Sequence, residues 1–231
     1  MEGMKKVAIF DIDGTIFRSS LLIEITEHLI ERELFPKKSR TGYEKQHEAW
    51  TNREGEYETY IGAVVEVFVK NLKGIKYKDF MDAIEYVIDK MKKRTYRYTR
   101  DLVAHYKKKG YFLLAISQSP KGALDKFCEH LGFDKVYGRI YEIGPDSRLT
   151  GEISDLHLIA NKANIVKRAV EKEGLTLTDS VGVGDTENDM PFLEMVSHPI
   201  CFNPNMTLYK AARRNKWNIV VERKNVIYEL D

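Results

Sequence analysis

The feature that most constrains the fold is the run VAIFDIDGTIF, in which two aspartates directly follow an apolar segment. Val7–Phe10 are typical of a short buried strand. Asp11 and Asp13 are two residues apart, so their side chains point to the same side of an extended chain. Gly14 then lets the backbone turn away from the sheet. Because a carboxylate beside a buried strand is costly unless it is compensated, the run predicts a ligand site at a strand end, where open α/β sheets bind ligands.

The segments that follow predict an α/β protein with a doubly wound, mostly parallel sheet. Between the first two strands the chain has only helical patterns, including residues 57–72 and 77–92. From Tyr111 onward, strands alternate with helices, which is typical of parallel βαβ units. Further strands are expected at residues 111–117, 136–141, 180–184, 199–202 and 217–221, and further helices at residues 122–131, 158–173, 191–195 and from Met206.

The long helical block between the first two strands does not fit a simple crossover. We interpret residues 18–96 as a helical cap domain inserted after the first strand, able to act as a lid. Residues 1–17 and 97–231 then form a Rossmann-like core domain.

The composition excludes membrane-spanning and disulfide-rich classes and favours a cytoplasmic protein. The chain is 43% hydrophobic and 31% charged, an ordinary balance for a globular protein. No apolar run reaches the roughly 18 residues of a membrane span, and Asp11 interrupts the first apolar run too early for a signal peptide. Cys128 and Cys201 lack metal or redox spacing, so we expect both to be reduced core residues.

A basic stretch with interleaved tyrosines runs from Lys90 to Lys109. It fits either a surface for nucleic acid or another polyanion, or a solvated helix face. The net charge of the whole chain is only +2, which favours the solvated face.

Three further features place polar side chains at the sheet edge that carries the two aspartates. The strand SVGVG ends in Asp185, and Asp189 follows one helical turn later. In AISQSP, Ser117 ends a strand and Ser119 is able to cap the helix that follows, whose free N–H groups can bind an anion. Lys162 lies on the inward stripe of its helix. Taken singly, the first two features also fit ordinary helix caps.

Together these residues point to phosphoryl transfer. The carboxylates that would share the pocket are Asp11, Asp13, Asp185 and Asp189. Each close pair would repel by about 4 kcal/mol at about 4 Å and an effective dielectric constant of about 20, so the group needs a cation. Oxygen ligands with open positions suit Mg²⁺. Lys162 adds positive charge, Ser117 can orient an anion, and a carboxylate can itself be the nucleophile.

The motifs DIDGTIF, SQSP, Lys162 and GDTENDMPF, in that order, resemble the haloacid dehalogenase (HAD) superfamily in its phosphoserine phosphatase-like branch. The resemblance implies a Mg²⁺-dependent phosphatase that hydrolyses a small phosphate monoester through an aspartyl-phosphate intermediate. Asp11 would be the nucleophile, and Asp13 would protonate the leaving oxygen and then activate water. An aspartate at position 13 favours hydrolysis over a persistent phosphoenzyme.

The resemblance also implies roles for the remaining site residues. The Mg²⁺ ligands would be Asp11, the main-chain carbonyl of Asp13, and Asp185. Asp189 would support the metal's waters or Lys162. The groups that hold the phosphoryl oxygens would be Ser117, the N–H of Gln118, Lys162 and Asn188.

The sequence departs from phosphoserine phosphatases at positions that bear on the substrate. Those enzymes place a glutamate about nine residues after the nucleophile, where this chain has Ser20, with Glu24 four residues later. They also tend to have Ser-Gly-Gly where this chain has residues 117–119, Ser-Gln-Ser. The identity of the substrate ester therefore stays open. Glu24 and Arg53 are candidates for binding the substrate, and the alternative interpretation is that both are ordinary surface charges.

Two other functions remain possible from the sequence. One is a phosphomutase or phosphotransferase of the same superfamily. The other is a nucleic-acid-associated phosphatase or binding protein that uses the stretch Lys90–Lys109. The expected partner is a small phosphorylated metabolite, without membrane association, and the oligomeric state is open.

Overall fold

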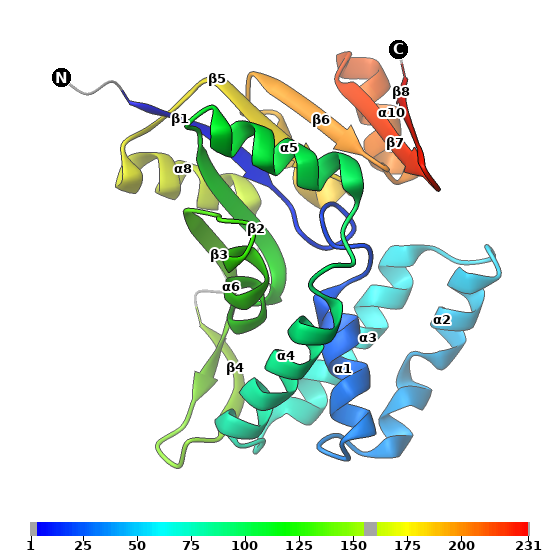
Figure 1. Cartoon of the computed structure of the whole chain (residues 1–231). Coiled ribbons are helices and arrows are strands. Elements are labelled where there is room, and N and C mark those ends of the chain that lie inside the picture. The colour runs from blue at the N-terminus through cyan, green and yellow to red at the C-terminus, as the bar shows by residue number, and fades with distance from the viewer. Residues whose placement is uncertain (1–3, 155–160, 231) are drawn as a thin grey trace. The chain divides into compact units, whose positions relative to one another are not determined.

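The computed structural model describes residues 4–154 and 161–230 (Figure 1). The chain divides into two compact units that are each assembled from separate segments. The core unit contains residues 1–18, 93–139 and 155–231, and the helical unit contains residues 19–92 and 140–154. The cap expected from the sequence was residues 18–96, so it did not include residues 140–154 of the helical unit.

The sheet is mostly parallel and doubly wound, as predicted from the sequence. Its strands among the described residues are β1 (Lys5–Phe10), β2 (Phe112–Pro120), β3 (Lys135–Ile143), β4 (Leu149–Ser154), β5 (Leu175–Gly184), β6 (His198–Phe202), β7 (Asn218–Arg223) and β8 (Val226–Leu230). Their order is β4-β3-β2-β1-β5-β6-β7-β8. The pairs β3–β4 and β7–β8 are antiparallel, and the others are parallel. The first strand of the chain therefore lies between β2 and β5.

Helices cover both faces of the core unit's sheet because successive side chains of β1 point to opposite faces. The helices of this unit are α5 (Arg97–Lys108), α6 (Lys121–Glu129), α8 (Lys162–Glu173), α9 (Met190–Leu193) and α10 (Met206–Asn215). Val7 and Ile9 join a buried cluster with side chains from α8, α9 and α10. Phe10 points to the opposite face, where its ring meets that of Phe133, just beyond α6, edge to face at 5.8 Å.

The helical unit combines helices with a β-hairpin. Its elements are α1 (Leu21–Glu31), the 3-10 helix η1 (Lys37–Gly42), α2 (Glu44–Thr51), α3 (Tyr57–Leu72), α4 (Tyr77–Met91), the end of β3, and β4. Tyr141 of β3 is only 7% exposed. Its ring centroid lies 5.5 Å from that of Phe68 on α3 and 6.5 Å from that of Phe80 on α4. This aromatic cluster fixes the hairpin to the helices of the unit.

The sequence analysis did not place α2, β4 or β8, and it gave α5 only as the solvated helix face that is one interpretation of the basic stretch Lys90–Lys109. Helix α2 has no buried residue, and α5 buries only Thr99 and Val103, so neither presents the apolar stripe that identifies a helix from sequence. Strands β4 and β8 are the two edges of the sheet, and β8 is largely exposed. Helices α3 and α4, with clear apolar stripes, were predicted within one residue.

Two predicted boundaries differ from the structure. The helix expected over 158–173 is described as α8 from Lys162, with the Asn161 side chain accepting a hydrogen bond from Ala163 N at 2.9 Å; residues 158–160 lie outside the described residues. Strand β2 continues to Pro120, so Ser119 is a strand residue. The sequence suggested that Ser119 caps α6, but it does not, and no side chain in the described part of the chain caps that helix.

Cys128 and Cys201 are buried, which confirms the prediction that they are core residues; their reduced state stays a prediction. Among the helices of the described residues, none is long and apolar enough to cross a membrane.

The central position of β1 predicts a large effect of truncating its side chains. Val7 is fully buried, whereas Val226 on edge strand β8 is 44% exposed. We expect Val7→Ala to lower the free energy of unfolding by about 2–3 kcal/mol, through lost burial and the cavity left behind. Val226→Ala should cost less than about 1 kcal/mol. Urea unfolding of both variants measures the difference, and equal losses would contradict the packing described for β1.

Candidate active site

A tight loop after β1 carries the two aspartates that open the site. The backbone N–H of Asp11 donates to Val183 O of β5 at 2.9 Å, so Asp11 still lies in the sheet, and it is 5% exposed. Gly14 has a φ of +80°, and a Cβ atom there would lie 2.2 Å from Asp185 Oδ2. Glycine is favoured at this position, because its φ is positive and an added Cβ atom would displace the carboxylate of Asp185, which follows β5.

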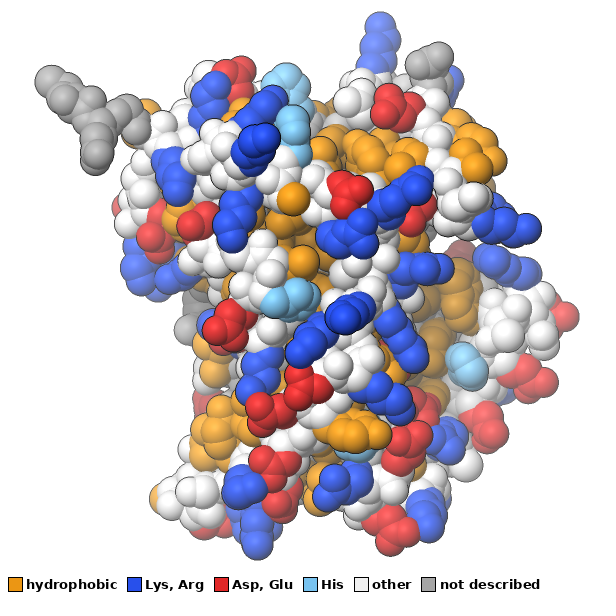
Figure 2. All heavy atoms as spheres, viewed as in Figure 1, with side chains coloured by type: hydrophobic (Ala, Val, Ile, Leu, Met, Phe, Trp, Pro, Cys, Tyr) orange, Lys and Arg blue, Asp and Glu red, His pale blue; other side chains and the backbone are white. Residues whose placement is uncertain are grey.

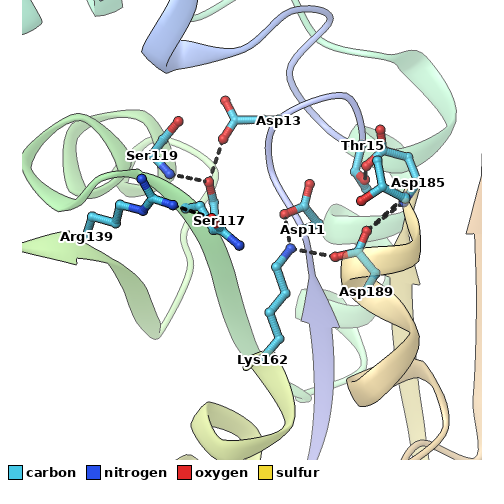
Figure 3. Close-up of polar contacts among 11 residues, drawn as sticks. Asp11, Asp13, Thr15, Ser117, Ser119, Arg139, Lys162, Asp185 and Asp189 are labelled. Carbon is cyan, nitrogen blue, oxygen red and sulfur yellow. Dashed lines mark hydrogen bonds and ion pairs between the residues drawn. The ribbon is translucent and has the colours of Figure 1, made fainter. Parts of the chain in front are cut away.

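Lys162, at the start of α8, joins two carboxylates from different elements. Its Nζ lies 2.5 Å from Asp11 Oδ1 and 2.5 Å from Asp189 Oδ1. All three side chains are less than 10% exposed. Figure 3 shows the ammonium group between the two carboxylates. Such close, buried ion pairs fix the geometry of the groups that form them.

Asp189 and Asp185 are held by the turn after β5. Asp189 Oδ2 accepts hydrogen bonds from the backbone N–H groups of Asp185 at 2.9 Å and Thr186 at 3.1 Å. This is part of a capping box at the 3-10 helix η2 (Glu187–Asp189), whose N-cap is Thr186 and not the aspartate at the end of the strand. The Thr15 hydroxyl donates to Asp185 Oδ1 at 2.9 Å. The loop after β1 therefore orients a carboxylate that follows β5.

Three carboxylates converge closely enough to hold a metal ion. Asp11, Asp185 and Asp189 each offer an oxygen atom, and these atoms lie within 4.8 Å of one another. Among the described residues, Lys162 supplies the positive charge that is bonded to this group, through Asp11 and Asp189. A hard divalent cation with oxygen ligands fits this set of donors. The side chain of Asp13 is not part of the group.

The electrostatics of the cluster support the same conclusion. Burial raises the pKa of Asp11 to about 8, with the charges of Asp189 and Asp13 adding to the effect and Lys162 opposing it. Burial, with the charges of Asp11 and Asp189, also raises the pKa of Asp185 well above its usual value. Burial lowers the pKa of Lys162, but the two neighbouring carboxylates more than offset this, so it rises. Lys162 alone therefore does not neutralise the cluster.

The second part of the site lies at the end of β2. The Ser117 hydroxyl donates to Asp13 Oδ2 at 2.5 Å and accepts from the backbone N–H of Ser119 at 3.0 Å. Arg139 Nη2 donates to Gln118 Oε1 at 2.5 Å. In Figure 3, Ser117 points toward Asp13, and Arg139 and Asp11 lie on either side of it. A hydroxyl, backbone N–H groups and a cation are suited to holding an anion.

The structure does not bring every predicted site residue into this arrangement. Asn188 is exposed in η2, and no hydrogen bond joins its side chain to another described residue. Glu24 and Arg53 belong to the helical unit; Arg53 is exposed, and its guanidinium lies 5.6 Å from the Trp50 ring centroid. Their roles, and that of Asn188, stay predictions.

Sequence reasoning missed Thr15 and Arg139. Thr15 lies inside the quoted DIDGTIF motif, so its proximity to the aspartates was visible, but its bond to Asp185 was not. Arg139 belongs to no motif, because only the pairing of β2 with β3 brings it beside Gln118.

The basic stretch lies on exposed surface. On α5, Arg97, Arg100, Lys107 and Lys108 are exposed, and Figure 2 shows lysine and arginine side chains across the face that carries this helix. Arg100 pairs with Asp101 at 2.9 Å. These observations fit the solvated helix face, and binding of nucleic acid stays an untested alternative.

The fold and this site define an α/β enzyme of the phosphoryl-transfer type, with buried carboxylates and a lysine at the carboxyl ends of parallel strands. Residues 8–194 match the family described as haloacid dehalogenase-like hydrolase. The chain belongs to this family, which confirms the resemblance found in its sequence motifs.

Several proteins similar to this chain are phosphatases. A phosphoserine phosphatase of Archaeoglobus fulgidus is 27% identical over 209 residues, which are 90% of this chain and 55% of that protein. A histidinol-phosphatase of Neisseria meningitidis serogroup C is 26% identical over 94% of this chain and 99% of its own length. The structure of a phospho-aspartyl intermediate analogue of phosphoserine phosphatase has a TM-score of 0.62 at 24% identity, covering 96% of this chain and 95% of that chain. The predicted class, a HAD-type phosphoric monoester hydrolase, agrees with the family and with these relatives.

The raised pKa of Asp11 predicts how metal binding and stability depend on pH. Between about pH 4 and pH 8 the metal-free native state binds a proton that the unfolded chain has released, so its stability falls as the pH rises through this window. A metal ion displaces that proton, and its binding strengthens over the same range. We expect Mg²⁺ at roughly five times its Kd to stabilise the protein by about 1 kcal/mol at pH 8, or about 2–4 °C.

Differential scanning fluorimetry with and without Mg²⁺ measures this effect. The shift should be smaller at pH 5.5 than at pH 8 and should disappear in Asp185→Asn. An equal shift at both values of pH would contradict the assignment of the cluster as the metal site.

Gly14 offers a second test of the cluster. In Gly14→Ala the new methyl group would displace Asp185, so we expect the Mg²⁺-induced shift in melting temperature to be lost. Gly110→Ala is a matched control, because Gly110 has a φ of +76° and nothing within 4 Å of the added Cβ. Both variants carry the backbone strain of about 1–2 kcal/mol. If both kept the Mg²⁺ shift, close approach at Gly14 would not matter for the site.

Proposed function

We propose that this protein is a Mg²⁺-dependent phosphatase that hydrolyses a small phosphate monoester through an aspartyl-phosphate at Asp11. The observation that carries the proposal is the placement of Asp11. It is buried, bonded to Lys162 at 2.5 Å, and grouped with Asp185 and Asp189 within 4.8 Å. A carboxylate held in this way between a lysine and a cation site is suited to attack a phosphorus atom.

The metal would be held by the side chains of Asp11 and Asp185 and, following the family pattern, by the main-chain carbonyl of Asp13. When bound, it would neutralise the carboxylates and polarise the phosphoryl oxygens. Asp189 would hold Lys162 in place and would not bind the metal directly, since its oxygens are already bonded to Lys162 and to two backbone N–H groups.

The chain's own residues would carry out two displacements at phosphorus. In the first, a carboxylate oxygen of Asp11 forms a bond to phosphorus, the ester P–O bond breaks, and Asp13 gives its proton to the leaving oxygen. In the second, Asp13 takes a proton from water, the water oxygen bonds to phosphorus, and the bond to Asp11 breaks. Phosphate and an alcohol are the products, and both aspartates return to their starting states.

Ser117 and Lys162 would bind the phosphoryl group between these steps. Without a ligand, the Ser117 hydroxyl donates to Asp13. Donating instead to a phosphoryl oxygen would release the Asp13 carboxyl group for proton transfer. Lys162, beside Asp11, would offset the charge that develops on the phosphoryl oxygens. The N–H of Gln118 and, from the family pattern, Asn188 would complete this set of phosphate-binding groups, which we call the phosphate cradle.

The substrate class is a small phosphorylated metabolite. The relatives named above are a phosphoserine phosphatase and a histidinol-phosphatase, which supports a small ester. Ser20 and Gln118 depart from the phosphoserine phosphatase pattern, so phosphoserine itself is not the substrate that we favour. Glu24 and Arg53 of the helical unit remain the candidates for selecting the ester.

Phosphate release from a generic aryl phosphate tests the proposal. We expect turnover with Mg²⁺, none with EDTA, and a loss of about 10³-fold or more in Asp11→Asn, because the nucleophile is removed. Asp13→Asn should lose about 10²–10⁴-fold, the usual contribution of a general acid–base group.

Asp101→Asn is a matched control, because it makes the same chemical change on the exposed surface of α5; its activity should equal that of the wild type. Turnover that survives in Asp11→Asn would exclude the covalent mechanism. A phosphotransferase would instead release phosphate poorly and transfer it to an added alcohol or sugar acceptor.

A further inference from the structure

The segment 117–119 bulges out of β2 beside β3. The pairs on either side of the bulge are Ile116 with Tyr137 and Pro120 with Arg139. Three residues of β2 therefore lie opposite the single residue Gly138. Bulges of this kind disrupt the local ladder and re-aim side chains, often next to active sites. Here the bulge carries Ser117 and Gln118, the two residues of β2 assigned to the phosphate cradle.

Strand β3 lies closely against this bulge. A Cβ atom at Gly138 would lie 2.9 Å from the carbonyl oxygen of Ser119 and 3.0 Å from Lys121 Cα. Both are backbone atoms, which cannot move away as the end of a flexible side chain can. The position of the bulge is therefore defined by β3, and the residue after Gly138 on that strand is Arg139.

Arg139 is bonded to the bulge, and it has no ionic partner among the described residues. Its Nη2 donates to Gln118 Oε1 at 2.5 Å. Its Nε is buried without a hydrogen-bond partner, and no carboxylate within the described ranges 4–154 and 161–230 forms an ion pair with it. A partly buried guanidinium with an unsatisfied N–H costs stability. Such a residue calls for an explanation other than stability of the fold.

We propose that Arg139 is a positioning residue of the phosphate cradle. By holding the side chain of Gln118, Arg139 fixes the bulge so that the Ser117 hydroxyl and the Gln118 N–H face the phosphoryl group. Its charge, which no carboxylate neutralises among the described residues, also favours an anion beside Ser117. This inference rests on the proposed function and refines its phosphate-binding site. A displacement of about 1 Å in such donors can lower a rate about 10²-fold.

The test is a double-mutant cycle between Arg139 and Gln118. Arg139→Met and Gln118→Met each remove one partner while keeping an apolar stem and, at position 118, the backbone N–H. Two quantities are measured with Mg²⁺ present: kcat and KM for an aryl phosphate, and the Kd of inorganic phosphate by calorimetry. We expect each single variant to lose about tenfold in kcat/KM and in phosphate affinity. The double variant should lose no more than either, since coupled residues are not additive.

Two further variants separate positioning from a general effect on the fold. Arg139→Lys keeps the charge and a donor, so it should recover most of the phosphate affinity. Arg213→Met makes the same change at an exposed position of α10 and should leave both quantities at wild-type values. Unfolding temperatures of all variants are compared. If Arg139→Met does not fold, Gln118→Met carries the test, and wild-type phosphate affinity in it overturns the proposal.

The outcomes distinguish this proposal from the proposed function. If the wild type releases no phosphate from esters but binds inorganic phosphate, and Arg139→Met weakens that binding about tenfold, the role of Arg139 stands and the hydrolase assignment fails. Wild-type phosphate affinity in Arg139→Met, or losses that add in the double variant, overturn the role of Arg139. A wild type that neither hydrolyses esters nor binds phosphate overturns both.

Discussion

The buried ion pairs of Lys162 with Asp11 and Asp189 are the interaction on which the rest of the site depends. Removing carboxylates from water is expensive, and a buried charge without a partner is strongly destabilising. Lys162 supplies one positive charge to a group of three carboxylates, so the cluster is held together but not neutralised. Burial, with the neighbouring carboxylates adding to its effect, raises the pKa of Asp11 to about 8, and the charge imbalance creates the demand for a further cation. The same interaction thus organises the fold locally and prepares the site for a metal.

The geometry of the sheet explains how these groups meet. Strands β2, β1 and β5 are adjacent and parallel, so their carboxyl ends lie at one edge. Residues far apart in the chain meet there; Lys162 is 151 positions from Asp11. Because the backbone approaches these carboxylates closely, two positions favour a residue without a side chain. Gly14 and Gly184 lie where an added Cβ atom would be 2.2 Å and 2.5 Å from Asp185 and Asp189, respectively.

The site has two parts with different chemistry, and Asp13 connects them. The first is the carboxylate cluster with Lys162, and the second is the bulge of β2 with Ser117. Asp13 belongs to the loop that carries Asp11, yet its carboxylate is bonded to Ser117. In the mechanism that we propose, this placement would let Asp13 serve both the departing alcohol and the attacking water. Because the cradle is a bulge and not a regular strand, its precision depends on the neighbouring strand β3.

The sequence by itself determined the fold class, the order of the main strands and helices, and the identity of most chemical groups. Apolar periodicity and short motifs such as DIDGTIF are local features, so they can be recognised in the sequence without knowing which residues they contact in the fold. Elements without an apolar stripe, such as α2 and α5, left no such signal. Only the tertiary structure decided that the Asp13 side chain bonds to Ser117 and lies outside the group of Asp11, Asp185 and Asp189. It also decided that Thr15 orients Asp185, that residues 140–154 belong to the helical unit, and that Arg139 holds Gln118. These contacts join residues distant in the chain, and strand pairing and burial, which depend on the whole fold, create them.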